Sequence, residues 1–205
     1  MPARSQNLAS KASSKECNDA VRFLVAQPLV RHSFRSEGGS TSPGTAYGAF
    51  VALGAYEDLG QTPPHPLKLI QSLKRLETPD GAWSNVPHAT IGATNATAGA
   101  VTLIRHLGFP VNERVADWLL AQAHPQGGFL AVPGAPMPDL LSTATVLHAL
   151  AAMDRRIPSA LHERCLDFID TLWNARGGFH GHWADDHLDA EYTFYGLLAL
   201  GHLSL

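Results

Sequence analysis

The sequence predicts an all-α protein built from repeated helical hairpins. The first observation is a glycine-aromatic turn that recurs about every 50 residues, at Asp80-Gly81-Ala82-Trp83, Gly127-Gly128-Phe129 and Gly177-Gly178-Phe179. The second is the spacing of apolar residues between these turns, which follows the helical period, whereas no run alternates with the period of a strand. A repeat of this length is typical of stacked units that bury their apolar faces only against one another.

The repeats stay in phase beyond the turn. A threonine follows each aromatic residue at the same spacing, at Thr97, Thr143 and Thr193. Asp139 and Asp189 precede two of these threonines by four residues, and a weaker copy of the unit contains Gly38-Gly39 and Thr45. We therefore expect one domain over 15–205, made of the repeats 15–60, 61–108, 109–157 and 158–205, after a flexible leader at 1–14.

The first helix of each repeat is predicted to be an outer, amphipathic helix. The clearest case begins near Pro158-Ser159 and ends near residue 172. One stripe of this helix carries five apolar residues: Leu161, Cys165, Phe168, Ile169 and Leu172. Its other face is charged, as expected for a helix that packs on one side only. The counterparts are expected at about 15–30, 66–77 and 112–124.

The second helix of each repeat is apolar or small nearly all round. These helices are expected at about 45–59, 94–107, 140–153 and 189–203. A helix that is apolar on every side is buried on every side, so these segments form an inner layer screened by the outer helices. Gly60 and Gly108 stand where helix-ending glycines are common.

The composition of the chain limits the kinds of partner that it is expected to bind. The chain has 205 residues, 45% hydrophobic and 16% charged, with a formal net charge of −3. This balance gives no general attraction to nucleic acid or to an anionic membrane. The two cysteines form no metal or disulfide motif, and no apolar run reaches membrane-spanning length. We expect a soluble, cytoplasmic protein.

The repeat resembles a known superfamily. The unit Gly-Gly-Phe, a spacer of about ten residues, and then Asp189-Ala-Glu-Tyr-Thr-Phe-Tyr-Gly-Leu-Leu-Ala-Leu is similar to the repeats of the protein prenyltransferase β subunits and the squalene/terpenoid cyclases. The resemblance covers about 15–205 and is strongest over 125–205. It implies an α/α toroid of concentric inner and outer helices around an apolar cavity that holds an isoprenoid or another apolar small molecule.

The ring implied by this resemblance is incomplete. The toroids of these families close with about six hairpins, whereas this chain has four. The apolar surface left at the ends of a four-repeat arc is typical of an interface. The ring is therefore smaller, or open, or completed by a second copy in a homo-oligomer or by a second subunit.

The zinc site of the prenyltransferases is predicted to be absent. Those enzymes place a cysteine and a histidine at the starts of successive inner helices, where this chain has Leu141 and Tyr192. Neither side chain supplies the thiolate or imidazole that zinc requires. No other cofactor is indicated.

The cyclases suggest a second kind of chemistry, in which a carboxylic acid of an Asp-x-Asp-Asp motif protonates an alkene. This chain has no such motif. The corresponding stretch supplies Asp185, Asp186, His187 and Asp189, which we expect to be the proton-handling residues of an enzyme. Clustered carboxylates beside an apolar cavity are expected to raise at least one pKa. The alternative is that Asp189 caps a helix and that Asp185 and Asp186 are solvated.

Six further residues are candidates for substrate binding because they fall near the starts of the predicted inner helices: Trp83, His88, Asp139, Trp183, Tyr192 and Tyr195. Aromatic faces there would stabilise a carbocation. Asp139 is also the expected N-cap of an inner helix, and the two roles are compatible. For Phe129 and Phe179, which repeat in phase, a core position is the favoured interpretation.

The loop that contains His180 and His182 also resembles a metal site, since imidazoles and carboxylates together bind zinc, iron or manganese. A solvated polar loop is the alternative. Three functions follow from these patterns: an enzyme acting on an isoprenoid, a non-catalytic relative that binds an apolar ligand or a protein, and a metal-dependent hydrolase or lyase on an unrelated α/α barrel.

Overall fold

The computed structural model describes residues 44–63 and 65–204. The described part is helical, with four two-residue strands and one short 3-10 helix. The expected leader, the outer helix at 15–30 and the turn at Gly38-Gly39 lie outside the described residues. The elements in chain order are α3 (Ala46–Asp58), α4 (Pro66–Leu73), η1 (Lys74–Leu76), α5 (Thr94–His106), α6 (Arg114–Leu120), β1 (Phe129–Leu130), β2 (Pro138–Asp139), α7 (Leu140–Ala152), α8 (Ser159–Leu172), β3 (Trp173–Asn174), β4 (Gly178–Phe179) and α9 (Ala190–Leu203).

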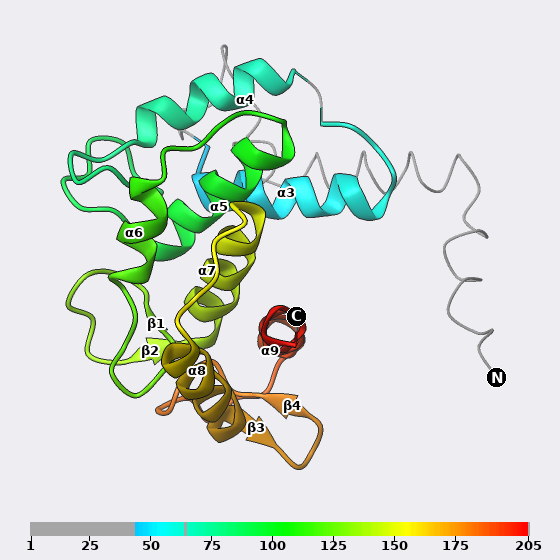
Figure 1. Cartoon of the computed structure of the whole chain (residues 1–205). Coiled ribbons are helices and arrows are strands. Elements are labelled where there is room, and N and C mark those ends of the chain that lie inside the picture. Colours follow the sequence, from blue (N-terminus) through cyan, green and yellow to red (C-terminus); the bar gives the residue numbers. More distant parts are fainter. Residues whose placement is uncertain (1–43, 64, 205) are drawn as a thin grey trace.

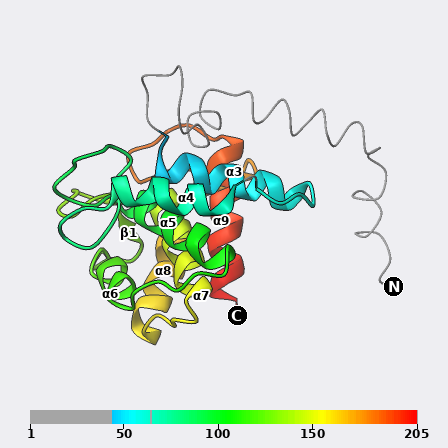
Figure 2. The ribbon, with the colours of Figure 1, turned by 90° about the horizontal axis from the view of Figure 1, so that it is seen from above.

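The inner layer follows the predicted order. Helices α3, α5, α7 and α9 pack against one another in succession, and α4, α6 and α8 lie outside them (Figure 1). Ten residues of α5 and nine of α7 are buried, as expected of helices that are apolar all round. The first and last described inner helices, α3 and α9, run in different directions (Figure 2) and meet near their starts, where the hydroxyl groups of Tyr47 and Tyr195 are hydrogen-bonded.

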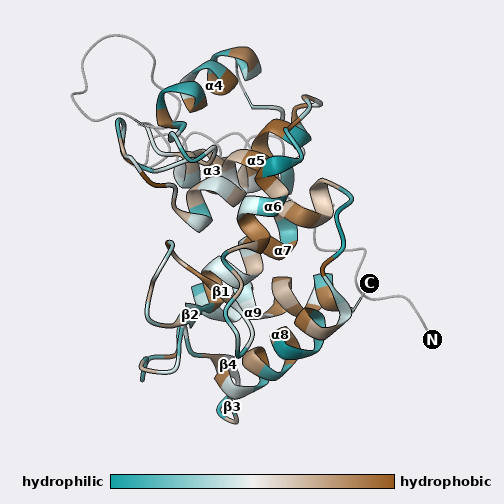
Figure 3. Cartoon of the chain, turned by 60° about the vertical axis from the view of Figure 1, so that its left-hand side comes forward, coloured by the Kyte–Doolittle hydropathy of each residue, from teal (hydrophilic) through white to brown (hydrophobic). Residues whose placement is uncertain are grey.

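The outer helices are amphipathic. In Figure 3, α4 and α8 alternate between hydrophilic and hydrophobic residues along their length. All five residues of the predicted stripe on α8 are buried. Helix α6 is shorter than the predicted 112–124, since the chain leaves the helix after Leu120 and turns toward the glycine pair at Gly127.

The glycine-aromatic turns form small antiparallel ladders that the sequence did not predict. β1 pairs with β2 and β3 pairs with β4, while isolated bridges join Glu77 to Trp83 and Ala123 to Phe129. The two bridges and the β3–β4 pair arise because each glycine turn reverses the chain and lays its two arms side by side, whereas β1 and β2 are joined across the loop 131–137. At Gly128 the φ angle is +72°, and a Cβ atom there would lie 2.7 Å from the Phe168 ring. Glycine is required on both counts.

At Trp83 and Phe129 the repeated threonine connects the turn to its inner helix. The Trp83 N–H donates to Thr97 Oγ1, and the Phe129 N–H donates to Thr143 Oγ1, both at 3.0 Å. Each hydroxyl in turn donates to the backbone carbonyl four residues before it, on Ala93 or Asp139. The constant spacing between the aromatic residue and the threonine in the sequence therefore reflects a buried hydrogen bond between them. Phe129 and Phe179 are core residues, 0% and 3% exposed.

No helix in the described part of the chain is long and apolar enough to cross a membrane.

Candidate functional site

The N-terminal ends of three inner helices carry side-chain caps. Asp139 Oδ1 accepts a hydrogen bond from the Ser142 N–H at 2.7 Å, and Asp189 Oδ1 accepts one from the Tyr192 N–H at 2.8 Å. Thr45 caps α3 in the same way through Gly48. The predicted capping roles of Asp139 and Asp189 are thus present, because a short oxygen-bearing side chain satisfies an N–H group that the helix leaves free.

The loop between Gly181 and Asp189 is organised by Asp185. Its carboxylate accepts hydrogen bonds from the backbone N–H groups of His187 and Gly181, each at 3.0 Å. These two bonds hold the pKa of Asp185 below its usual value. For this residue the expectation of a raised pKa was wrong, because the loop turns its amides inward onto the carboxylate. His187 Nδ1 lies 3.5 Å from the same carboxylate, and Asp186 is exposed.

The carboxyl group with a raised pKa is that of Asp139. Burial raises it, and this effect exceeds the opposing hydrogen bonds from the Ser142 N–H and hydroxyl. His182 and Tyr192 are close enough to interact with Asp139 electrostatically, and the pKa of Tyr192 is raised by burial and then by that carboxylate. The Leu140 N–H donates to the Gly181 carbonyl at 2.8 Å, which joins the loop to the start of α7.

A second cluster joins the first and last described inner helices. The hydroxyl groups of Tyr47 on α3 and Tyr195 on α9 are hydrogen-bonded to each other, and the Tyr47 hydroxyl lies 3.4 Å from Glu191 Oε1. Burial, followed by the contact with Tyr195, raises the pKa of Tyr47. Burial also raises the pKa of Tyr195. Both phenols therefore stay protonated and act as hydrogen-bond donors near neutral pH.

Aromatic rings continue from this cluster along the inner helices. The centroid of Phe194 lies 5.2 Å from that of Tyr195, Tyr47 lies 6.1 Å from Phe50, and Phe50 lies 6.0 Å from His148. His148 in turn lies 5.0 Å from His202. We call this set the aromatic row: Phe194, Tyr195, Tyr47, Phe50, His148 and His202. At the Glu191 end of the row the Phe194 ring is 58% exposed.

Sequence reasoning named Tyr195 but missed Tyr47 and Glu191 as members of one site. A weak signal was present, because the pair Tyr47-Gly48 recurs as Tyr195-Gly196. The position of Glu191 one turn before Tyr195 on α9 places its carboxylate beside the phenols.

The remaining predicted binding residues lie elsewhere. Trp183 packs edge-on against Phe168 of α8, with ring centroids 5.5 Å apart, and donates to the Thr171 hydroxyl. It is thus part of the outer layer. Trp83 is buried in the turn before α5. His88 is exposed and has a φ of +63° in the loop that follows.

The residues at the helix starts do not fit the zinc ion of the prenyltransferases. Leu141 has no donor atom, both oxygens of Asp139 accept from Ser142, and the Tyr192 phenol has a raised pKa that opposes ionisation. His180 is also occupied, with Nδ1 at 3.0 Å from the His187 carbonyl and Nε2 at 3.1 Å from Asn174. Among the described residues, no three His, Cys, Asp or Glu side chains converge on a point that would hold a metal.

Comparison with solved structures places the fold. The chain is similar to the type II terpene cyclase MstE from Scytonema without ligand, with 16% identity and a TM-score of 0.61 over 95% of this chain and 59% of that one. A variant in complex with its substrate, geranylgeranyl dihydroxybenzoate, matches with 15% identity and a TM-score of 0.60 over 94% and 58%. A variant in complex with its product, merosterolic acid A, matches with 14% identity and a TM-score of 0.60 over 94% and 60%.

The chain thus spans less than two thirds of the length of these cyclases. No curated protein matches the sequence. The sequence profile of the prenyltransferase alpha-alpha toroid domain matches residues 97–204, just over half of the chain. Together with the alternating inner and outer helices, this match shows that the chain belongs to the prenyltransferase alpha-alpha toroid family.

Proposed function

We propose that this protein binds an isoprenoid or another long apolar substrate along the aromatic row and transforms it by acid–base or carbocation chemistry, as a terpenoid cyclase-like or prenyltransferase-like enzyme. The observation that carries the proposal is the carboxylate of Glu191, held by the Tyr47 hydroxyl at the Phe194 end of the row. An acid beside aromatic faces is the combination that a protonated alkene requires, since the faces stabilise the positive charge.

In the proposed reaction a carboxylic acid gives its proton to a double bond of the substrate. The acid O–H bond breaks, a C–H bond forms, and a later loss of a proton from the cation makes the overall change an isomerisation. Glu191 is our first candidate for the donor. Asp139 is the second, because its raised pKa keeps it protonated to a higher pH than an ordinary aspartate.

Among the acidic residues expected from the sequence, Asp185 and Asp189 accept backbone hydrogen bonds that maintain the loop and the helix start. Asp186 and His187 are exposed. We therefore retain Asp189 chiefly as a comparison. Asn caps a helix about as well as Asp, so Asp189→Asn removes the acid without removing the cap.

The proposal is tested with geranylgeranyl dihydroxybenzoate, the substrate in the similar cyclase complex. Purified protein is incubated with it, and liquid chromatography with mass spectrometry detects a product of unchanged mass and altered retention. Glu191→Gln is expected to lower turnover by about 100-fold or more, with thermal stability nearly unchanged. Asp189→Asn is expected to retain turnover. Full turnover in both Glu191→Gln and Asp139→Asn would exclude the acid role.

A non-catalytic protein that binds an apolar ligand or a partner protein is the second candidate. It is favoured because the carboxylates of Asp185 and Asp189, which were expected to handle protons, accept backbone hydrogen bonds that maintain the loop and the start of α9. Saturable quenching of tryptophan fluorescence by the same compound, without any product, would support this reading over the enzyme. Convergence of a metal on His180 and His182, as a metal-dependent enzyme would need, receives no support from their contacts.

We also propose that a second copy of the chain, or a second subunit, covers the exposed apolar residues at the ends of the arc. Leu197 on α9 is 61% exposed and Val51 on α3 is 44% exposed. Light scattering of the purified protein measures the mass, and Leu197→Glu should dissociate a homo-oligomer. A monomeric mass at high concentration would argue against a homo-oligomer. A cytoplasmic location is in keeping with the free, buried thiol of Cys165.

A further inference from the structure

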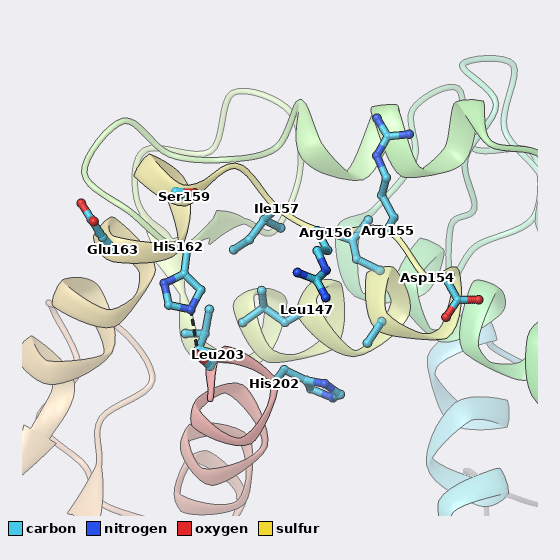
Figure 4. A pocket seen from close by; sticks show the side chains of 12 residues that line it. Leu147, Asp154, Arg155, Arg156, Ile157, Ser159, His162, Glu163, His202 and Leu203 are labelled. Atoms are coloured by element: carbon cyan, nitrogen blue, oxygen red, sulfur yellow. Dashed lines mark hydrogen bonds between the residues drawn. The ribbon is translucent and has the colours of Figure 1, made fainter. Parts of the chain in front are cut away.

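A pocket of about 710 Å³ lies at the C-terminal ends of α7 and α9, at the far end of these helices from Asp139 and Glu191. Its walls come from α7, from the connection 154–157, from the start of α8 and from the end of α9 (Figure 4). Its volume is in the range of small-molecule sites. The pocket shares His202 with the far end of the aromatic row, but Tyr47, Tyr195 and Glu191 do not line it, so it is separate from the proposed reaction centre at Glu191.

The floor of the pocket is apolar. Leu147, Leu150 and Leu203 line it, and each is buried, with exposures of 5%, 1% and 6%. Ile157 adds a half-buried side chain from the connection. A surface of this kind takes the hydrocarbon part of a ligand, because contact removes apolar area from water.

Of the charged residues that line the pocket, only Arg156 is directed over its floor (Figure 4). Arg155 donates to Asp117 at 2.9 Å and points away from the pocket, as does Glu163 at its edge (Figure 4). Arg156 is directed over the floor near Leu147 (Figure 4). Within the described ranges no carboxylate lies at ion-pair distance from Arg156. Asp154 is the other acidic residue of the lining and lies beside Arg155 at the edge.

The start of α8 contributes Ser159 and His162 to the lining of the pocket. Helix α8 begins at Ser159 without a side-chain cap, and the N–H groups of Leu161 and His162 donate to the Pro158 carbonyl, which leaves the N–H groups of Ser159 and Ala160 as possible donors. The His162 Nε2 atom lies 2.8 Å from the Leu203 carbonyl and must donate to it, which fixes the ring at the wall of the pocket. A guanidinium group presents paired donors that match the two oxygens of a carboxylate.

We propose that this pocket binds a small amphipathic carboxylate, with its hydrocarbon body on Leu147, Leu150 and Leu203 and its carboxylate on the guanidinium group of Arg156. The positive end of the α8 dipole, at Ser159 in the same lining, strengthens the preference for an anion. The ligand class is that of a short fatty or aryl acid. The site extends the function of the chain beyond the reaction proposed at Glu191 and does not depend on it.

The test uses octanoate as the probe and the full chain. Isothermal titration calorimetry gives the affinity, and the imidazole signal of His162, which lines the pocket and is not part of the aromatic row, reports in proton–nitrogen spectra whether octanoate binds there. Arg156→Gln is expected to weaken binding by about tenfold or more, because it removes the charged partner. Arg155→Gln, which changes the neighbouring arginine that pairs with Asp117, is the matched control and should bind octanoate as the wild type does. Both variants change exposed side chains, and thermal melting verifies that they fold.

1-Octanol separates the anion from the hydrocarbon. The wild type is expected to bind 1-octanol about tenfold or more weakly than octanoate. Arg156→Gln is expected to bind 1-octanol as tightly as the wild type does, because the alcohol carries no charge for Arg156 to pair with. Equal octanoate affinity in Arg156→Gln and the wild type would overturn the proposal. Shifts confined to the Tyr47 and Tyr195 signals would also overturn it, because they would assign octanoate to the aromatic row. The absence of any binding heat and of any signal shift with octanoate would overturn it as well.

Discussion

Nδ1 of His148 on α7 lies 2.9 Å from Nε2 of His202 on α9, so the two imidazoles share one hydrogen bond between inner helices. His202 Nδ1 is buried and has no hydrogen-bond partner in the described part of the chain. An unpaired nitrogen that carries no hydrogen is less costly than a buried N–H without an acceptor. We therefore infer that Nε2 of His202 carries the hydrogen and donates to His148. Both rings are neutral in this arrangement.

The first prediction concerns pH. Burial, and then the neighbouring His202, lower the pKa of His148, and burial lowers that of His202, both from an ordinary value of 6.5. Below about pH 6.5 the unfolded chain therefore binds more protons than the folded chain, and the free energy of unfolding falls as the pH falls. His202→Gln should reduce the loss of stability between about pH 7.5 and about pH 5.5, as measured by urea denaturation.

His88→Gln is the matched control, because His88 is exposed in a loop and should leave the pH dependence as it is in the wild type. If the stability of His202→Gln falls with pH as steeply as that of the wild type, then the pair does not contribute.

The second prediction concerns Asp139. Its raised pKa means that the folded state holds a proton more tightly than the unfolded state, so this residue lowers stability as the pH rises above 3.8, its ordinary pKa. Asp139→Asn keeps the cap and removes the buried charge, and it should be at least as stable as the wild type at neutral pH. Asp139→Ala loses the bond to the Ser142 N–H and should cost about 1 kcal/mol in the free energy of unfolding. Urea denaturation at neutral pH ranks the three, and an Asn variant less stable than the Ala variant would contradict the assignment.

The third prediction concerns the threonine that repeats in the sequence. Thr143 is fully buried, and its hydroxyl accepts from the Phe129 N–H and donates to the Asp139 carbonyl. Thr143→Val keeps the shape but leaves the Phe129 N–H without its partner, which should cost about 1–3 kcal/mol. Thr143→Ser retains the hydroxyl and should lose less. Equal stability of the Val and Ser variants would show that the bond contributes little.

The inner helices were predictable because their signal is local. The expected segment 140–153 compares with Leu140–Ala152, and the expected segment 94–107 with Thr94–His106. Each is defined by a run of apolar residues between a cap or turn and a chain reversal. Burial on all sides was correctly expected for α5 and α7 but was wrong for α9, which has four buried residues and leaves Phe194 and Leu197 exposed because it lies at the end of the arc.

The cluster of Tyr47 with Glu191 and Tyr195 was not predictable in the same way. Tyr47 and Glu191 are 144 residues apart, and their contact depends on how far each hairpin rotates relative to the one before. The rotations of successive hairpins add up over the four inner helices, and their sum cannot be predicted from a pattern of residues in the sequence. The lowered pKa of Asp185 is a similar case, because it depends on the direction in which two loop amides point.

The fourth prediction separates backbone strain from packing at two glycines. Gly128 and Gly134 have φ angles of +72° and +79°, so alanine is strained at both. A Cβ atom at Gly134 would meet no atom within 4 Å, and Gly134→Ala should cost about 1 kcal/mol from the backbone alone. At Gly128 the Cβ atom would also collide with the buried Phe168 ring, which should add roughly 1–3 kcal/mol. Thermal melting with urea denaturation measures both, and similar losses for the two variants would mean that Phe168 moves aside without cost.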